Sequence, residues 1–229
     1  MSWTFTADEF AYVWRSETGE DRCPFPITTR SAARDEADYD SLAAAAARRW
    51  PTGADPDLTA VLRHAARPAT ALALFDSAGP SQRAFGARTG ERGVVLRQHD
   101  DGSVEVFSGA STMVARAFAS FLGDQPAGSA GHLVEDVDRL TAHFESWQRP
   151  AESVAARMHK LAGAGRAAAG YLEVTTGAGP ARYLTWFDVK DDGRYLTYRR
   201  FRDLHIEPAD KDRLIGAIND LCAPVEADY

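Results

Sequence analysis

The sequence has little cysteine and lysine and no long apolar segment. Its two cysteines, Cys23 and Cys222, are too few for a disulfide framework or a cysteine-based metal cluster, so we expect a reducing, cytoplasmic environment. No apolar run reaches the about 20 residues that a membrane helix needs. The first residues lack the basic start and the apolar core of a signal peptide, so we expect no membrane insertion.

Sequence motifs for catalysis and for cofactor binding are also missing. The glycines of residues 163–165 follow an expected helix and precede an expected strand, the reverse of the order in a phosphate-binding loop. Asp188, Asp191 and Asp192 match a calcium loop only in part, because Lys190 stands where an oxygen ligand is needed. The histidines form no HExxH pair, and no G-x-S-x-G elbow occurs. We therefore predict no enzyme activity and no catalytic, cofactor-binding or metal-binding residues.

The sequence instead contains many signals of helices and strands. The face formed by Phe10, Val13 and Trp14 has helical spacing, and Thr6 with Glu9 predicts a capping box at the start of that helix. The chain as a whole is predicted to be α+β, an antiparallel sheet with helices packed on it. An alanine-rich helix near 31–50 is expected to pack closely against its neighbours. Further helices are expected near 8–17, 58–65, 112–122, 137–147, 154–161 and 210–222, and strands near 70–76, 83–89, 93–98, 103–108, 170–176, 182–189 and 194–201, with 204–207 as a further short one.

The two halves of the sequence follow the same plan. Each has an Asp-Asp-Gly segment, at 100–102 and 191–193, followed by a strand and then a helix with a similar apolar stripe. Each Asp-Gly pair predicts a two-residue hairpin turn, because both central positions of such a turn need positive φ. We interpret the pattern as helix, three strands and helix occurring twice, in pseudo-symmetric halves of one compact unit. The halves are residues 1–123 and 132–229, joined by a linker at 124–131; chance coincidence of two hairpins is the alternative.

Several motifs occur in order along nearly the whole chain. They are the Ala-Asp-Glu-Phe of 7–10 with Trp14, the Pro-x-Pro turn of 24–26, the Leu-Thr-Trp-Phe-Asp of 184–188, the Asp-Gly-Arg-Tyr of 192–195 and the Pro-Ala-Asp of 208–210. In these motifs the chain resembles the EspG family of type VII (ESX) secretion chaperones. The resemblance implies a cytosolic chaperone of two α/β halves. It also implies a partner, the PPE subunit of a PE–PPE heterodimer, which the chaperone would keep soluble and deliver to the secretion machine.

The substrate and some other functions stay open at this point. The candidate loop at 77–80 is shorter than the corresponding loop of mycobacterial members, which takes part in substrate recognition, so a related ESX substrate is an alternative to PE–PPE. A homodimer is compatible with the sequence. An enzyme whose residues meet only in three dimensions is one rival class. A nucleic-acid-binding module built on the Arg/Tyr strand is another, but the net charge of −7 argues against it, and we expect no nucleic-acid partner.

The strand of residues 194–202 interleaves arginines with tyrosines, two residue types that are enriched at protein interfaces. With a two-residue turn, Trp186 would lie opposite Arg199, and the two could form a cation–π pair. That face would also carry Tyr195, with Arg97 at the equivalent place in the first half. We predict Arg97, Trp186, Tyr195 and Arg199 as partner-binding residues. The alternative is that helices cover both faces of the sheet, which would place Trp186 in the core.

Overall fold

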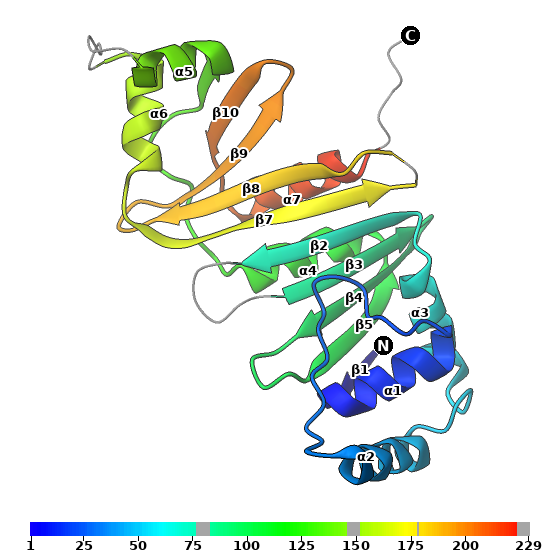
Figure 1. Ribbon diagram of the computed structural model, residues 1–229. Helices are drawn as coiled ribbons and strands as arrows, with labels where there is room; N and C mark the ends of the chain where they lie inside the picture. The colour runs from blue at the N-terminus through cyan, green and yellow to red at the C-terminus, as the bar shows by residue number, and fades with distance from the viewer. Residues whose placement is uncertain (77–82, 146–151, 178, 224–229) are drawn as a thin grey trace.

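One antiparallel sheet of ten strands runs through the computed structural model, which describes residues 1–76, 83–145, 152–177 and 179–223 (Figure 1). The strand order is β1-β5-β4-β3-β2-β7-β8-β9-β10-β6. The strands are β1 (Ser2–Phe5), β2 (Thr70–Asp76), β3 (Arg83–Thr89), β4 (Arg92–Gln98), β5 (Val104–Ala110), β6 (Leu133–Asp136), β7 (Arg166–Thr176), β8 (Arg182–Val189), β9 (Arg194–Arg200) and β10 (Asp203–Pro208). The helices are α1 (Ala7–Thr18), α2 (Glu36–Arg49), α3 (Pro56–Ala66), α4 (Thr112–Phe121), α5 (Val137–Glu145), α6 (Val154–Ala162) and α7 (Lys211–Cys222). The predicted α+β class is confirmed; the loop expected at 77–80 lies outside the described residues.

Helices α1 and α3 cover one face of the N-terminal part of the sheet. α1 begins at the predicted capping box, in which Glu9 N donates to Thr6 Oγ1 (3.2 Å) and Thr6 N donates to Glu9 Oε2 (2.9 Å). Its buried face of Phe10, Val13 and Trp14 forms one core with α3 and with the inward side chains of β3, β4 and β5. Burial of each large apolar side chain contributes about 1.5–3 kcal/mol, so this face fixes α1 on the sheet.

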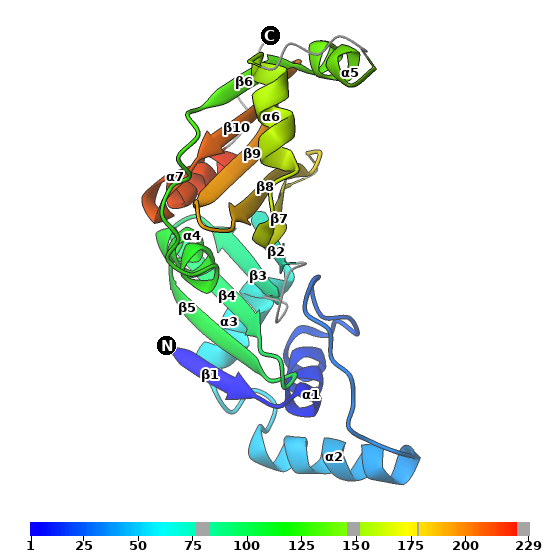
Figure 2. The ribbon, with the colours of Figure 1, turned by 90° about the vertical axis from the view of Figure 1, so that its left-hand side faces the viewer.

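Helix α2 lies outside that core, so the prediction of a closely packed helix is wrong. Of its residues only Ala46 is buried, and the helix packs along α1 at the edge of the molecule (Figure 2). It also begins later than predicted, at the N-cap Asp35, whose side chain accepts from Asp38 N (2.9 Å). Alanine side chains offer little area to bury, and the remaining positions are mostly polar. The composition therefore forms a helix without anchoring it in a core.

Helices α4 and α7 lie next to each other on the opposite face of the sheet (Figure 2). Val114 and Phe118 of α4 and Leu214 and Ile218 of α7 are fully buried in one core cluster. The same cluster contains the inward side chains of β2, β7 and β8, so it spans the middle of the molecule. This core holds the N-terminal and C-terminal parts of the sheet together.

Helices α5 and α6 cover the C-terminal part of the sheet on the same side as α1 and α3. Leu140 of α5 and Met158 of α6 pack on Phe187, Tyr195 and Ile206. Helices therefore lie on both faces at the two ends of the sheet. Over those parts, the structure shows the alternative considered from the sequence, in which helices cover both faces of the sheet.

Both Asp-Gly hairpins carry three-residue loops, and the predicted two-residue turns are wrong. In the first, His99 N donates to Ser103 O (2.9 Å), and only Gly102 has a positive φ (83°). In the second, Val189 N donates to Gly193 O (2.9 Å), and the positive φ (60°) belongs to Asp191. A type I′ turn needs positive φ at both central residues, which neither hairpin provides. The strand registers predicted from these turns are therefore wrong as well.

The order of elements repeats along the chain, with β1 to α4 followed by a comparable series from β6 to α7. Each series has four consecutive strands before its last helix, one more than in the proposed repeat of helix, three strands and helix, and the sheet order is mirrored about the β2–β7 pair. That the two halves superpose, with limits at 1–123 and 132–229, stays a prediction. The segment 124–131 packs against the start of β9, where Arg194 N donates to Pro126 O (2.8 Å) and Gly128 N donates to Arg194 O (3.1 Å).

Candidate partner-binding surface

The centre of one sheet face is uncovered. On the side opposite to α4 and α7, no helix of the described chain crosses β2, β7 and the first part of β8 (Figure 1). Side chains alternate along a strand, so residues of one parity face the core and those of the other face this open area. Leu172 and Val174 of β7 are fully buried in the α4–α7 core, whereas Tyr171 and Glu173 belong to the open side.

Four aromatic side chains from four separate segments form a line across this area, which we call the aromatic stripe: Phe25, Phe75, Tyr171 and Tyr183. Ring centroids of Phe25 and Phe75 lie 6.5 Å apart, those of Phe75 and Tyr171 5.8 Å, and those of Tyr171 and Tyr183 6.4 Å. Phe25 and Tyr183, at the two ends, are 55% and 54% exposed. Aromatic rings packed in this way hold each other in place while they leave apolar area in contact with water.

A shallow hollow of about 510 Å³ adjoins the stripe at Tyr171 and Tyr183. Arg166, Glu173 and Thr185 bring charged and polar groups to its rim, and Gly170 is also among the residues that line it. The surface thus combines apolar rings with hydrogen-bonding groups of both kinds. Such a combination suits a protein partner with an apolar side chain at the centre of contact and polar groups around it.

Trp186 does not lie on an exposed face, and that part of the site prediction is wrong. It pairs with Leu196 of β9, not with Arg199, and only 1% of its surface is exposed. Its ring lies in the α4–α7 core, where the guanidinium of Arg194 stands 5.2 Å from the ring centroid. The three-residue loop shifts the register by an odd number of residues, and such a shift moves side chains to the other face.

Tyr195 is also buried, with no exposed surface, so its predicted exposure is wrong. Its ring stacks on Phe187 with centroids 5.5 Å apart, beneath α5 and α6. Its hydroxyl donates to Asp192 Oδ2 (2.5 Å) and accepts from Ala130 N (2.9 Å). Burial and the bond to Asp192 raise the pKa of Tyr195. Tyr195 thus holds the 124–131 segment against the second hairpin.

Arg97 and Arg199 lie in different surroundings. Arg97 is half-buried on the α4 side, where its guanidinium stands 4.5 Å from the ring centroid of Phe121. Arg199 is exposed near the end of β9 and pairs across the sheet with Leu204. The structure does not bring the four predicted residues together on one face. That Arg97 and Arg199 contact a partner stays a prediction.

The members of the aromatic stripe were missed from the sequence, although a signal for two of them existed. In residues 170–176 apolar and polar side chains alternate, with Leu172 and Val174 in one phase and Tyr171 and Glu173 in the other. The same alternation separates Leu184 from Tyr183 in the next strand. Period-two alternation places Tyr171 and Tyr183 on the face that is not the main core. No local pattern identifies Phe25 or Phe75 as their neighbours.

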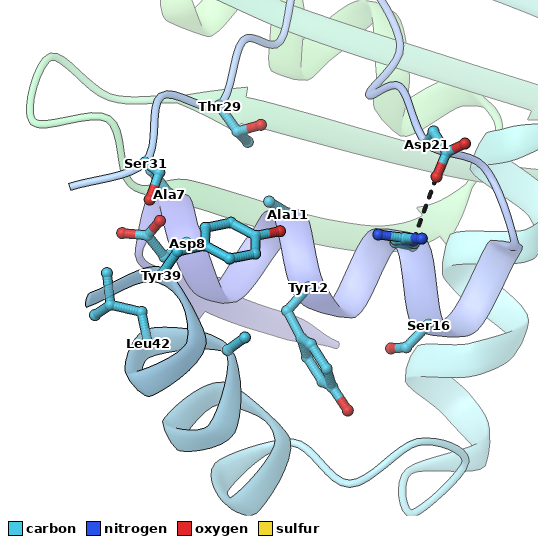
Figure 3. Close-up of a pocket in the computed structure, with 12 residues that line it drawn as sticks. Ala7, Asp8, Ala11, Tyr12, Ser16, Asp21, Thr29, Ser31, Tyr39 and Leu42 are labelled. Atoms are coloured by element: carbon cyan, nitrogen blue, oxygen red, sulfur yellow. Dashed lines mark ion pairs between the residues drawn. The ribbon is translucent and has the colours of Figure 1, made fainter. Parts of the chain in front are cut away.

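A separate pocket of about 640 Å³ lies between α1, α2 and the segment after α1 (Figure 3). Its two carboxylates, Asp8 near Tyr39 and Asp21, are at opposite ends (Figure 3). Asp8 Oδ2 accepts from Ala32 N (3.1 Å), and Asp21 Oδ1 lies 3.3 Å from Arg15 Nε. The polar groups are engaged in fixing the segment to α1, and they do not converge on one point as an acid–base site would require.

Two further features bear on the class of function. Among residues 1–76, 83–145, 152–177 and 179–223, no group of three or more His, Cys, Asp or Glu side chains is arranged to hold a metal ion. Within the same residues, no helix has both the length and the apolar character to cross a bilayer.

Comparison with known proteins identifies a family and a similar fold. The model of the EspG family matches residues 6–220. A similar solved structure is that of the Mycobacterium tuberculosis type VII secretion system chaperone EspG5 in complex with a PE25–PPE41 dimer. The two chains share 14% identity and align with a TM-score of 0.67 over 98% of each. No curated protein matches the chain.

Proposed function

We propose, because this chain belongs to the EspG family, that it is a chaperone of type VII secretion that binds a PE–PPE-like helical heterodimer. The chaperone would act in the cytoplasm as a binding protein and not as an enzyme. It would keep its substrate soluble until the substrate reaches the secretion machine. The family match over residues 6–220 is the observation that carries this proposal, together with the fold shared with an EspG5 chaperone that was solved bound to a PE25–PPE41 dimer.

The aromatic stripe is the surface that we assign to the substrate. A helical protein with an apolar tip tends to self-associate, because large exposed apolar patches promote aggregation. A cover for such a tip needs apolar area on a firm support. The stripe provides both, since Phe75, Tyr171 and Tyr183 stand on a continuous sheet backed by the α4–α7 core. Tyrosine and other large aromatic residues often carry most of the binding energy at interfaces.

Co-expression tests the proposal. The chain is produced with a PE–PPE-like pair encoded near it, and complex formation is measured by size-exclusion chromatography and by the soluble fraction of the pair. We expect a stable complex without ATP. The variant Tyr183→Glu should lose the complex, because it places a charge at the exposed end of the stripe.

Tyr39→Glu is the matched control, because Tyr39 on α2 is 52% exposed and Tyr183 is 54% exposed. It should leave the complex intact. If none of the candidate pairs co-elutes or gains solubility, the chaperone function is contradicted. If a pair binds equally to the wild type and to Tyr183→Glu, the function stands and the assignment of the surface fails. Charge reversals at Arg97 and Arg199 test in the same assay whether those side chains contact the pair.

A further inference from the structure

Strands β8 and β9 separate partway along their length. They pair from Asp188–Arg194 to Thr185–Thr197 and no further, although β8 extends back to Arg182 and β9 extends on to Arg200. In Figure 1 β9 and β10 leave β8 at a wide angle, with α7 behind the opening. The equivalent strands of the first half, β3 and β4, stay paired over their whole length. The opening is therefore a local feature of the second half.

The opening forms a slot of about 930 Å³. Leu184, Ala217 and Leu221 give it an apolar floor, and Tyr183 and Tyr198 stand at its sides. Its edges are strand edges. In an antiparallel strand, the backbone N–H and C=O groups of every second residue point to the same neighbouring strand. Val189 N donates to Gly193 O across the hairpin, so the backbone groups of Val189 point toward β9. Tyr183 is six residues from Val189 and Arg199 is six residues from Gly193, so their backbone N–H and C=O groups point toward the slot in the same way.

The slot is rich in positive charge. Arg182, Arg199, Arg200 and Arg213 line it, and Asp220 is the acidic residue among the lining side chains. Arg213 is bonded to Glu207 and lies 3.8 Å from Asp220, so its charge is compensated.

The other three arginines differ in this respect. Arg182 donates to two neutral oxygens, Thr176 Oγ1 (3.3 Å) and Ala223 O (2.7 Å). Within the described part of the chain, no carboxylate lies within ion-pair distance of Arg182, Arg199 or Arg200. Guanidinium groups beside open strand edges attract carboxylates and backbone amides together.

We propose that this slot binds an extended, acidic segment of a partner protein, which adds its backbone to the free edge of β8 or β9. Strand addition of this kind derives affinity from main-chain hydrogen bonds and specificity from alternate side chains. Acidic side chains would meet Arg182, Arg199 and Arg200, and apolar side chains would face Leu184 and Leu221. The proposal does not depend on the proposed chaperone function, because it concerns an extended segment and not a helical tip. The slot and the aromatic stripe share Tyr183.

A synthetic peptide tests the slot directly. The probe is a fluorescein-labelled nonapeptide of alternating Val and Glu, and binding to the full chain is measured by fluorescence anisotropy. We expect saturable binding that weakens with added salt. The variant Arg199→Glu/Arg200→Glu should weaken binding by about tenfold or more, because two attractions become repulsions. The control Arg48→Glu/Arg157→Glu changes the same charge at exposed arginines elsewhere and should bind like the wild type.

Three comparison probes separate the possible causes of binding. A Val–Lys peptide should not bind, and a Val–Glu peptide methylated at alternate backbone nitrogens should bind much more weakly. Equal binding of either peptide would overturn the proposal. So would an unchanged affinity of a folded Arg199→Glu/Arg200→Glu variant, or preferential binding of a single-stranded oligothymidylate. A wild type that binds a PE–PPE-like pair but not the Val–Glu peptide would overturn the slot proposal alone.

Discussion

Phe75 of β2 and Tyr171 of β7 pack against each other at the centre of the sheet, with ring centroids 5.8 Å apart and ring planes tilted by 37°. β2 belongs to the first series of elements and β7 to the second, and the two strands pair along their whole shared length. The aromatic stripe therefore exists only because the two parts of the chain meet edge to edge. The surface that we assign to the substrate is a product of the joined sheet and not of either part.

Gly170 is predicted to be essential for this junction. A Cβ at this position would stand 2.5 Å from the backbone oxygen of Phe75 and 3.0 Å from the Trp186 indole, closer than packed atoms approach. Gly170→Ala should therefore lower the free energy of unfolding by about 1–3 kcal/mol, as overpacked core sites do. Gly131→Ala is the control, because a Cβ there would meet nothing within 4 Å. Denaturant unfolding checks both, and equal stabilities of the two variants would contradict the prediction.

Arg194 and Asp188 form a second relationship that can be tested. Arg194 Nε donates to Asp188 Oδ1 (2.8 Å), and Arg194 Nη2 donates to Asp188 Oδ2 (3.0 Å) and to Leu122 O (2.7 Å) at the end of α4. Arg194 has no exposed surface, so Arg194→Met leaves the Asp188 carboxylate buried without a cationic partner. We expect a loss of about 3–5 kcal/mol in the free energy of unfolding, and a smaller loss when Asp188→Leu is combined with it.

The exposed ion pair of Arg202 with Asp138 provides the comparison for that variant. Both side chains are largely exposed, so Arg202→Met should change stability by no more than about 1 kcal/mol. Thermal or urea unfolding of the two single variants measures the difference. A loss at Arg194 as small as that at Arg202 would show that the buried pair does not secure α4 to the second hairpin.

The histidine pair at the β6–β10 edge predicts a pH dependence. His132 Nε2 and His205 Nδ1 lie 3.1 Å apart. Burial, and then the charge of His132, lower the pKa of His205; Arg200 lowers it further, whereas Asp203 and Glu207 act in the opposite direction. The unfolded chain binds a proton at His205 more readily than the folded chain does. The contribution of neutral His205 to the free energy of unfolding is therefore complete above the unfolded pKa of about 6.5, and it is lost as the pH falls below that value.

His205→Phe should remove this contribution while keeping the stacking on Tyr198, whose ring centroid lies 4.8 Å from that of His205. We expect the free energy of unfolding to fall less steeply between about pH 7 and pH 5 in the variant than in the wild type. Urea unfolding at a series of pH values gives both slopes. Parallel slopes would contradict the prediction.

The parts of the fold that were predictable are those decided by neighbouring residues. The capping box of Thr6 and Glu9 depends on residues three apart, and the buried face of α1 depends on one helical period. Strand positions followed from short alternating segments in the same way. The register of β8 and β9 was not predictable, because Asp191 takes the positive φ in a loop where Asp-Gly favoured another turn.

The binding surface was out of reach for a different reason. In β8 large side chains occur in both phases, so alternation assigns Trp186 and Tyr183 to opposite faces but does not show whether the face of Tyr183 stays uncovered. The half of β8 near Phe187 lies under α6 and is buried on both faces, whereas the half near Tyr183 has one open face. Which stretch of a sheet stays uncovered depends on where distant helices pack, and a single sequence does not contain that information locally.

The most direct test of the central claim is the dissociation constant for a PE–PPE-like heterodimer, measured by calorimetry for the wild type, Tyr183→Ala and Tyr39→Ala. If the aromatic stripe binds the substrate, Tyr183→Ala should weaken binding by about 2 kcal/mol, roughly thirtyfold, because the variant removes a large, exposed aromatic contact. Tyr39→Ala should leave the constant unchanged, although its side chain is equally exposed. A Tyr183→Ala variant that is folded and binds as tightly as the wild type would contradict the claim.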